Sequence, residues 1–435
     1  MRIKFQSPTG MHDILGEDQK YFQKIYNVVN EIATFYHFEK IETPILEETE
    51  LFSKGVGVTT DVVQKQMFSL KTKGGDHLTL RPEGTASVVR AYLQHGMHAL
   101  LKPVKLWYFG PFFRYEKPQF GRFRQFWQFG LETIGEESPI RDAEIVQIFY
   151  NILTKLKLKD LIIEVNSIGA SCCRPYYKKL LVNYLKSRAN SLCVNCRRRI
   201  KENPLRILDC KEEKCQRIVS QAPQIIDHLC QNCHQHFKEF LEILDELEIP
   251  YHLNPYLVRG LDYYTRTVFE IFPNFPEDKD AKKEGVEEVK PSALGGGGRY
   301  DNLVKVLGGK PTFAVGGSGG IERIVLWMKK RGVKVSKEVK PEIFLAQLGS
   351  LAKRKSLKLM EEFRKERLPI LESLGRDSLR AQLKIADKMG VKYSLIFGQK
   401  EALQGTIIIR HMATGKQREV KLDKIVKEVK KLIKK

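Results

Sequence analysis

The sequence predicts an α+β protein of several domains, and three observations lead to this expectation. Strand-like alternation flanks a helix-rich, cysteine-rich stretch, the last hundred residues alternate strands with helices, and 435 residues are too many for one core. We therefore expect a strand-rich body in two parts (1–169 and 251–330), interrupted by a mainly helical inserted domain at 170–250. A linker at 331–340 then leads to a small α/β domain at 341–435.

The first part of the body begins with an expected helix. Residues 17–37 carry apolar side chains at helical spacing. Residues 38–52 follow as a strand interrupted by Pro44, which belongs at a sheet edge or an interface. A short strand at 78–81 precedes a second helix, and Pro82 suits the first turn of that helix.

Residues 105–135 are expected to form two strands joined by a polar loop. On the returning strand, period-two alternation directs apolar side chains to one face. The other face carries Arg122, Arg124, Phe126, Gln128, Gly130 and Glu132, and the outgoing strand adds Arg114 and Glu116. Guanidinium groups suit phosphate oxygens, an aromatic ring can stack on a flat base, and Gln128 or Glu132 can recognise an N–H group. The alternative is a solvated sheet face with incidental ion pairs.

Two further stretches are candidate binding sites. The glycines of residues 316–325 allow backbone to approach a ligand, and the helix that follows presents its N-terminus to anions. Arg323 lies in the first turn, where a cation opposes the helix dipole, so we expect a phosphate between them. The alternative is a tightly packed strand–helix turn. In residues 81–86, Glu83 is either a binding carboxylate or an ordinary first-turn acid.

All eight cysteines lie between Cys172 and Cys233, and they include two C-x-x-C pairs. In a chain without a secretion signal, this pattern favours metal over disulfides. If Cys193, Cys196, Cys230 and Cys233 converge, they form a structural zinc site with four thiolates. The competing ligands are Cys210, Cys215, His228, His234 and His236. The alternative is eight reduced thiols in which C-x-x-C arises incidentally.

Composition narrows the classes of function. The formal net charge of +22 favours polyanionic partners, nucleic acid above all, although a lysine-rich proteome would give the same charge. No apolar run approaches the roughly 20 residues of a membrane span, and the N-terminus has no apolar signal region. We therefore expect a cytoplasmic protein with no membrane partner.

Six motifs in order make the chain resemble the bacterial-type histidyl-tRNA synthetase family of class II aminoacyl-tRNA synthetases over essentially its whole length. FRYE (113–116) with R-x-x-x-F (122–126) is similar to class II motif 2, GGIERIVLWM (319–328) to motif 3, and the strand with Pro44 to the dimer-forming motif 1. LVRGLDYYTRTVFE (257–270) and GGGRYD (296–301) resemble two histidine-specific motifs, and SLRAQLKIADKMG (378–390) resembles part of the anticodon-binding domain.

The resemblance implies a fold and an activity. The fold is the class II antiparallel sheet flanked by helices, with ATP bent across it and an anticodon-binding domain at the C-terminus. The activity is that of a histidine–tRNA ligase, in which L-histidine and ATP form histidyl-adenylate and pyrophosphate before the histidyl group passes to tRNA-His. Mg²⁺ and a homodimer are implied as well.

The resemblance also implies residue roles. The residues implied to bind ATP are Arg114, Glu116, Arg122, Phe126 and Arg323. Those implied to bind histidine are Glu83, Gly84, Thr85, Arg114, Gln128, Glu132, Arg259, Tyr263 and Tyr264. Arg259 and Arg114 are implied as catalytic, because the substrate carboxylate is itself the nucleophile and the reaction needs alignment and positive charge at phosphorus. Arg266 has no expected role.

Two other functions fit parts of the sequence. The synthetase-like regulatory subunit of ATP phosphoribosyltransferase binds histidine but lacks an anticodon-binding domain and the arginine that corresponds to Arg259, and this chain has both. A general basic RNA-binding protein would explain the charge but not the ordered ligand face. Three features depart from the family pattern: a longer, more charged loop at 273–292, Gln66 in place of a glutamate, and His411 in place of an aspartate.

Overall fold

The computed structural model describes residues 5–119, 121–274, 292–335 and 341–433. The chain forms two compact units, Met1–Val335 and Ser336–Lys435. Among the described residues, no helix combines the length and apolar character that crossing a membrane requires.

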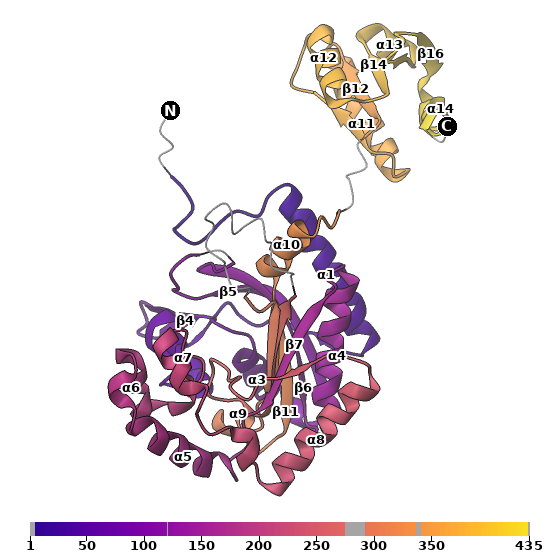
Figure 1. Ribbon diagram of the computed structural model, residues 1–435. Helices are drawn as coiled ribbons and strands as arrows, with labels where there is room; N and C mark the ends of the chain where they lie inside the picture. The colour runs from indigo at the N-terminus through magenta and orange to yellow at the C-terminus, as the bar shows by residue number, and fades with distance from the viewer. Residues whose placement is uncertain (1–4, 120, 275–291, 336–340, 434–435) are drawn as a thin grey trace, which may run out of the picture. The chain divides into compact units, whose positions relative to one another are not determined.

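An eight-stranded sheet organises the first unit (Figure 1). Its strands, in spatial order, are β1 (Glu39–Lys40), β5 (Val104–Phe113), β6 (Gln125–Ile134), β11 (Ala314–Gly320), β10 (Gly295–Arg299), β9 (Thr265–Pro273), β7 (Leu161–Ser167) and β8 (His252–Leu253). The six long strands pair antiparallel, and only the two-residue strands at the edges pair parallel within the described sheet. The predicted antiparallel sheet is confirmed.

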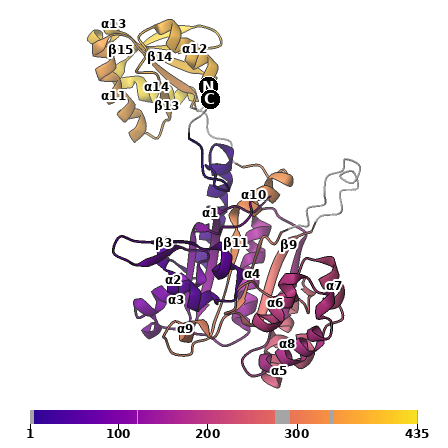
Figure 2. The same ribbon diagram turned by 90° about the vertical axis from the view of Figure 1, so that its left-hand side faces the viewer.

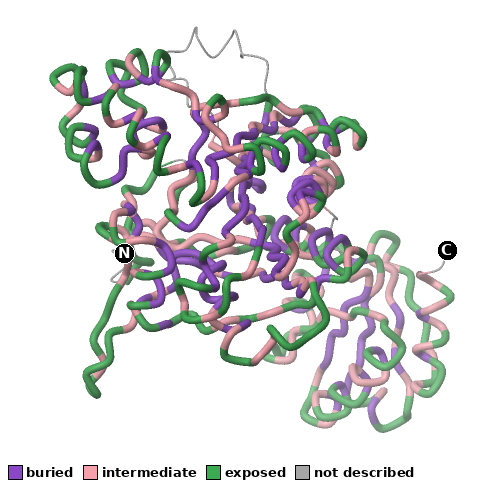
Figure 3. The backbone as a smooth tube through the Cα atoms, turned by 90° about the horizontal axis from the view of Figure 1, so that it is seen from below, coloured by how far each residue is buried: buried purple, intermediate pink, exposed green. Residues whose placement is uncertain are grey.

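One face of this sheet is covered by helices. They are α1 (Glu17–Phe35), α4 (Ile140–Lys155), α8 (Gln231–Glu246) and α10 (Ile321–Lys330). Trp107, Phe129 and Leu131 of the hairpin pack there with Phe149 of α4 and Phe240 of α8 in one buried cluster. Figure 3 shows this buried centre of the unit, with exposed residues on the outer sides of the helices. The apolar face that alternation predicts for residues 125–134 is therefore confirmed.

Smaller elements extend the other face. The helices α2 (Thr49–Val56), α3 (Thr85–Gln94) and α9 (Leu303–Val306) pack against one another. Beside them, β2 (Leu46–Glu48), β4 (His77–Leu80) and β3 (Phe68–Lys71) form a three-stranded antiparallel sheet. The strand expected over 38–52, with an interruption at Pro44, is present as two short strands, β1 and β2, and its end is instead the start of α2. Pro44 lies between the two strands, where it has no N–H to donate to a ladder.

The segment 170–250 is mainly helical. It contains α5 (Arg174–Lys186), α6 (Val194–Glu202), α7 (Glu213–Val219) and α8, which gather beside the sheet in both views (Figures 1 and 2). Phe240 of α8 lies in the main core, and Tyr177 of α5 packs in a second cluster that also holds Val88 and Tyr108. The described part of this segment thus shares its apolar contacts with the sheet.

The second unit is an α/β domain, as the alternation of its strands and helices predicts. Its sheet has the order β13 (Ile370–Glu372), β12 (Ile343–Gln347), β14 (Tyr393–Phe397), β15 (Thr406–His411) and β16 (Gln417–Lys421). Its helices are α11 (Ser350–Lys365), α12 (Leu379–Met389), α13 (Gln399–Gln404) and α14 (Ile425–Ile433). Phe363, Leu395 and Ile409 belong to its own buried core.

Candidate active site

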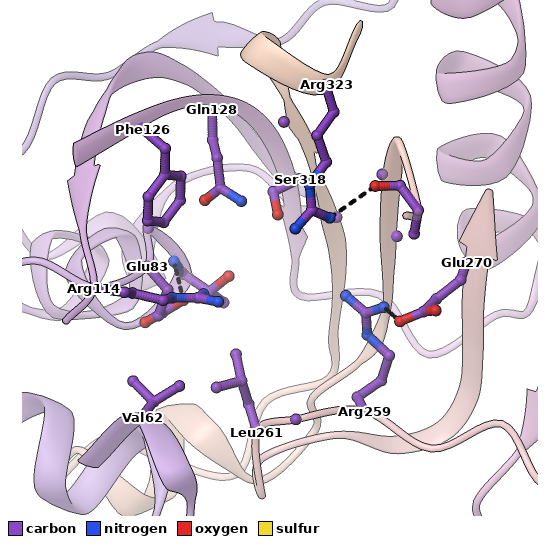
Figure 4. A pocket seen from close by; sticks show the side chains of 18 of the residues that line it. Val62, Glu83, Arg114, Phe126, Gln128, Arg259, Leu261, Glu270, Ser318 and Arg323 are labelled. Carbon is purple, nitrogen blue, oxygen red and sulfur yellow. Dashed lines mark hydrogen bonds and ion pairs between the residues drawn. The ribbon is translucent and has the colours of Figure 1, made fainter. Parts of the chain in front are cut away.

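A cavity of about 310 Å³ opens on the polar face of the eight-stranded sheet (Figure 4). It collects side chains from β6, the N-terminus of α3, the loop before β9 and the junction of β11 with α10. The lining includes Glu83, Gly84, Thr85, Arg114, Glu116, Arg122, Phe126, Gln128, Arg259, Tyr263, Tyr264 and Arg323. All the residues that the sequence predicts to bind ATP or histidine lie in this described lining, except Glu132. The expected loop at 273–292 lies almost entirely outside the described residues.

The β5–β6 hairpin presents Phe126 and Gln128 to the cavity. Their neighbours Phe129 and Leu131 are buried on the opposite side. Arg124, which was expected on the binding face, is not in the described lining of the cavity. Its guanidinium lies 4.0 Å from the centre of the Tyr115 ring instead.

Arg114, Arg122 and Arg323 are three of the five arginines in the described lining of the cavity. Arg114 donates from Nε to the Pro82 carbonyl at 2.9 Å, and its guanidinium lies 5.4 Å from the centre of the Phe126 ring. Arg323 donates to the carbonyl oxygens of Gly121 and Ala293 at 3.0 and 2.9 Å. Burial, followed by the nearby guanidinium groups of Arg122 and Arg114, lowers the pKa of Arg323. Mutual repulsion of this kind is relieved by an anion, so the cavity is suited to phosphate groups.

Arg259 reaches the cavity from the loop before β9. Its Nη1 forms an ion pair with Glu270, which Figure 4 shows at the wall opposite Phe126. The Nε of Arg259 is buried and has no hydrogen-bond partner among the described residues. At Gly296 on β10, a Cβ atom would lie 2.7 Å from Nη1 of Arg259 and 2.7 Å from the Phe269 carbonyl oxygen. Glycine is therefore required at position 296 for this approach.

Glu83 lines the cavity and lies directly before the N-terminus of α3. It accepts hydrogen bonds from the backbone N–H groups of Thr85 and Ala86 at 2.7 and 2.8 Å, and so caps α3. The Tyr263 hydroxyl donates to the same carboxyl group at 3.3 Å. Burial raises the pKa of Glu83. One carboxyl group thus connects the helix N-terminus with the histidine-motif tyrosines, whose two rings lie 4.6 Å apart.

Glu132 lies behind the cavity wall and has no solvent exposure. Its Oε1 accepts from the Thr85 hydroxyl at 2.7 Å and its Oε2 from the Tyr300 hydroxyl at 2.6 Å. Burial raises the pKa of Glu132 to about 8. In the described structure it reaches the cavity through Thr85, which lines it.

The cavity is also lined by residues that the sequence did not indicate. The lining also includes Tyr108, Arg206, Asp209, Glu270, Ser318 and Glu322. Glu322 accepts from the backbone N–H of Trp127 at 2.9 Å, and burial raises its pKa to about 7. Glu270 and Glu322 lie inside recognised motifs, which is the signal that could have found them. Arg206 and Asp209 carry no local signal, because only the fold brings the inserted segment to the cavity. Arg266, which had no expected role, pairs with Glu137 at 3.0 Å.

The predicted zinc ligand set is wrong. Cys193 and Cys196 group with Cys210 and Cys215, whereas Cys230 and Cys233 group with Cys172 and Cys173. The two C-x-x-C pairs begin different helices, α6 and α8, and each pair meets cysteines from another part of the segment. The three candidate histidines belong to neither described group.

Comparisons with known proteins agree with this geometry. A family model described as histidyl-tRNA synthetase matches residues 10–324, and one described as an anticodon binding domain matches residues 342–432. The chain is 43% identical over 429 residues to a protein of Dehalococcoides mccartyi named histidine–tRNA ligase, which covers 99% of this chain and 100% of that protein. The structure of apo S. aureus histidyl-tRNA synthetase is 34% identical, with a TM-score of 0.77, and covers 98% of this chain and 99% of its own.

A more distant structure has a similar fold. It is named an ATP phosphoribosyltransferase regulatory subunit/histidyl-tRNA synthetase from Bacillus halodurans C, and covers 92% of this chain and 99% of its own. Its TM-score is 0.62 at 20% identity, so this likeness concerns the fold alone. The full-length matches at higher identity are decisive, and the chain belongs to the histidyl-tRNA synthetase family.

Proposed function

We propose that this cavity is where the chain, an ATP-dependent aminoacyl-tRNA ligase, activates L-histidine for transfer to tRNA-His. A carboxylate oxygen of histidine attacks the α-phosphorus of ATP, the bond to the β-phosphate oxygen breaks, and pyrophosphate leaves. The terminal ribose hydroxyl of the tRNA then attacks the histidyl carbonyl carbon, and AMP leaves. The observation that carries this proposal is the convergence of Arg114, Arg259 and Arg323 on one cavity with buried carboxyl and phenol groups.

ATP is assigned to the side of the cavity that Phe126 lines. The ring of Phe126 offers a stacking surface for adenine, with Arg114, Arg122 and Arg323 for the phosphates. Glu116 and Glu322 line the cavity with carboxylate oxygens, the donor type that Mg²⁺ prefers, and they would hold such an ion. Bound Mg²⁺ neutralises phosphate charge.

Histidine is assigned to the side formed by the α3 N-terminus and the tyrosines. Glu83, Thr85 and Gln128 suit the amino group, and the Tyr108 ring packs against Gly84 where a Cβ would lie. Tyr264 and the Glu132 carboxyl group behind Thr85 suit the two imidazole nitrogens, with Tyr263 beside them. An apolar analogue would leave these buried groups unpaired, which supports discrimination of roughly 10⁴–10⁵.

Arg259 and Arg114 are assigned to the reacting groups. Within the part of the chain that the structure describes, the buried Nε–H of Arg259 has no partner beside the ion pair with Glu270, so it can donate to a carboxylate or an α-phosphate oxygen. Removing one preorganised donor of this type typically lowers the rate by about 10²–10³-fold.

The test is histidine-dependent exchange of pyrophosphate into ATP. We expect exchange with histidine and not with other amino acids, and a loss of orders of magnitude in Arg259→Ala. No exchange with any amino acid would exclude ligase activity. The regulatory-subunit alternative predicts histidine binding without exchange.

The proposal extends to partners and location. The partner proposed is tRNA, and the net charge of +22 favours binding of its phosphates. The location proposed is the cytoplasm. Ile45, Leu46 and Leu70, on or beside the three-stranded sheet, are more than a third exposed and support a homodimer interface there. Sedimentation equilibrium measures this assembly, and a monomer at micromolar concentration would contradict it.

A further inference from the structure

The eight cysteines form two separate groups of four within the inserted segment. In each group the four sulfur atoms lie within 4.8 Å of one another. All eight cysteines are described, and all carry free thiols. The helices that bear them lie together in Figures 1 and 2.

The first group joins the start of α5 to the start of α8. Cys172 and Cys173 immediately precede α5, Cys230 is the N-cap of α8, and Cys233 lies in its first turn. The Cys172 sulfur lies 3.1 Å from that of Cys230, 3.7 Å from that of Cys233 and 4.0 Å from that of Cys173. Four sulfurs at about 2.3 Å from a tetrahedral zinc ion lie roughly 3.8 Å apart, whereas a disulfide needs about 2.05 Å. The spacing matches a shared ion.

The second group joins the start of α6 to the loop and helix that follow. Cys193 is the N-cap of α6, and its sulfur accepts from the Cys196 backbone N–H at 3.4 Å. The Cys193 backbone N–H donates to the Cys215 sulfur at 3.3 Å, and the Cys210 sulfur lies 4.0 Å from that of Cys193. Amide donors and a helix N-terminus both favour thiolate over thiol. These contacts therefore orient the sulfur atoms as metal ligands.

We propose that the chain holds two structural zinc ions, one bound by Cys172, Cys173, Cys230 and Cys233, the other by Cys193, Cys196, Cys210 and Cys215. Each site has four protein ligands, which closes the tetrahedral shell and leaves no position for a substrate. Binding releases the remaining thiol protons to solvent and changes no oxidation state. Tetrahedral sites of four thiolates suit zinc or iron, and zinc is the ion of closed structural sites of this kind.

The first zinc site supports the histidine-motif loop. Arg174 directly follows Cys173, and its Nη2 donates to the carbonyl oxygens of Tyr264 and Gly169 at 2.7 and 2.8 Å. Because Cys173 is a ligand, the ion fixes the backbone from which Arg174 reaches this loop. Through Arg174, the site thus helps to hold the backbone of Tyr264 in place.

The second zinc site supports another wall of the cavity. Arg206 and Asp209 lie between the ligands Cys196 and Cys210, and both line the cavity. Arg206 also pairs with Asp61 at 3.0 Å, and Asn203 donates to Asp262 at 2.7 Å. An ion bound by Cys196 and Cys210 joins the two ends of this short segment and so fixes the positions of the residues that make these contacts.

Metal content tests the proposal without any assay of activity, so its failure and that of the ligase proposal are distinguishable. Untagged protein, purified without chelator and analysed by inductively coupled plasma mass spectrometry, should contain two zinc ions per chain. Zinc well below one ion per chain, iron in its place, or native disulfides found by intact mass would overturn it.

Paired variants assign the two sites. Cys172→Ser with Cys230→Ser should lose one zinc ion and keep the other, and Cys193→Ser with Cys210→Ser should do the same. His234→Ala is the matched control, because this exposed histidine lies beside Cys233 and belongs to neither group. It should keep both ions. Retention of both ions by either double variant would contradict the assigned ligands.

Cobalt substitution tests thiolate ligation in the wild-type protein, so it does not depend on the folding of the double variants. Wild-type protein produced with Co²⁺ should show the visible bands of tetrahedral cobalt and intense sulfur-to-metal charge-transfer absorption, scaling with two ions per chain. Absence of the charge-transfer bands in cobalt-loaded protein would exclude thiolate ligation.

Discussion

The Tyr300 hydroxyl donates a 2.6 Å hydrogen bond to Oε2 of Glu132, a carboxyl group with no solvent exposure. Because burial raises the pKa of Glu132 to about 8, this group is mostly protonated at neutral pH before a ligand binds. The protonation state of Glu132 is therefore coupled to folding.

The first prediction is a pH dependence of stability that disappears in Glu132→Gln. The folded pKa of about 8 lies above the unfolded value of roughly 4.3, so the stabilisation is fully present below pH ~4.3 and is lost as pH rises to about 8. The free energy of unfolding of wild type minus that of the variant should fall across this window by up to about 1.4 kcal/mol per pH unit. Urea unfolding between pH 5 and 8.5 measures it. Parallel curves for the two proteins would contradict the raised pKa.

The second prediction concerns Glu270, which orients Arg259. Glu270→Gln keeps the size of the side chain but removes the charge that holds the guanidinium. We expect the kcat of pyrophosphate exchange to fall about 10-fold, against about 10²–10³-fold for Arg259→Ala, with little change in the KM for ATP. Glu361→Gln, at a carboxyl group on α11 that pairs with Arg364 in the second unit, is the control. An equal loss of kcat in Glu270→Gln and Arg259→Ala would show that Glu270 does more than position Arg259.

The third prediction is that Gly296→Ala disrupts the site without removing any polar group. The added methyl would meet Nη1 of Arg259 and the Phe269 carbonyl oxygen, each at 2.7 Å. One of these contacts is to backbone, so the strands must shift, at a cost of roughly 1–3 kcal/mol, and Arg259 is displaced. Thermal unfolding and exchange activity should both fall. Gly375→Ala, where a methyl has nothing within 4 Å, should leave both unchanged.

Local patterns predicted the parts of this molecule that depend on neighbouring residues. Alternation along residues 125–134 separates buried Phe129 from Gln128 in the cavity, because a strand turns successive side chains to opposite faces. The division of the cysteines into two groups of four could not be predicted. The spacing of C-x-x-C alone does not say which cysteines meet, because that depends on how the helices pack. Arg206 likewise enters the site only through the fold of the inserted segment. The family resemblance predicts which residues bind the substrates. Which residues of the inserted segment lie beside them depends on long-range packing.

The fourth prediction separates two arginines of the motif 2 loop that lie two positions apart. Arg122 lines the cavity and pairs loosely with Glu116 at 3.4 Å, whereas Arg124 stacks on Tyr115 outside it. Arg122→Gln should raise the KM for ATP by about 10-fold, equivalent to about 1.4 kcal/mol, because one phosphate contact is lost. Arg124→Gln should leave the KM for ATP within about two-fold of wild type, since in the described structure its charge does not reach the cavity. Pyrophosphate exchange at varied ATP concentration measures both variants. If Arg124→Gln raised the KM as much as Arg122→Gln, overall positive charge and not placement in the cavity would determine ATP binding.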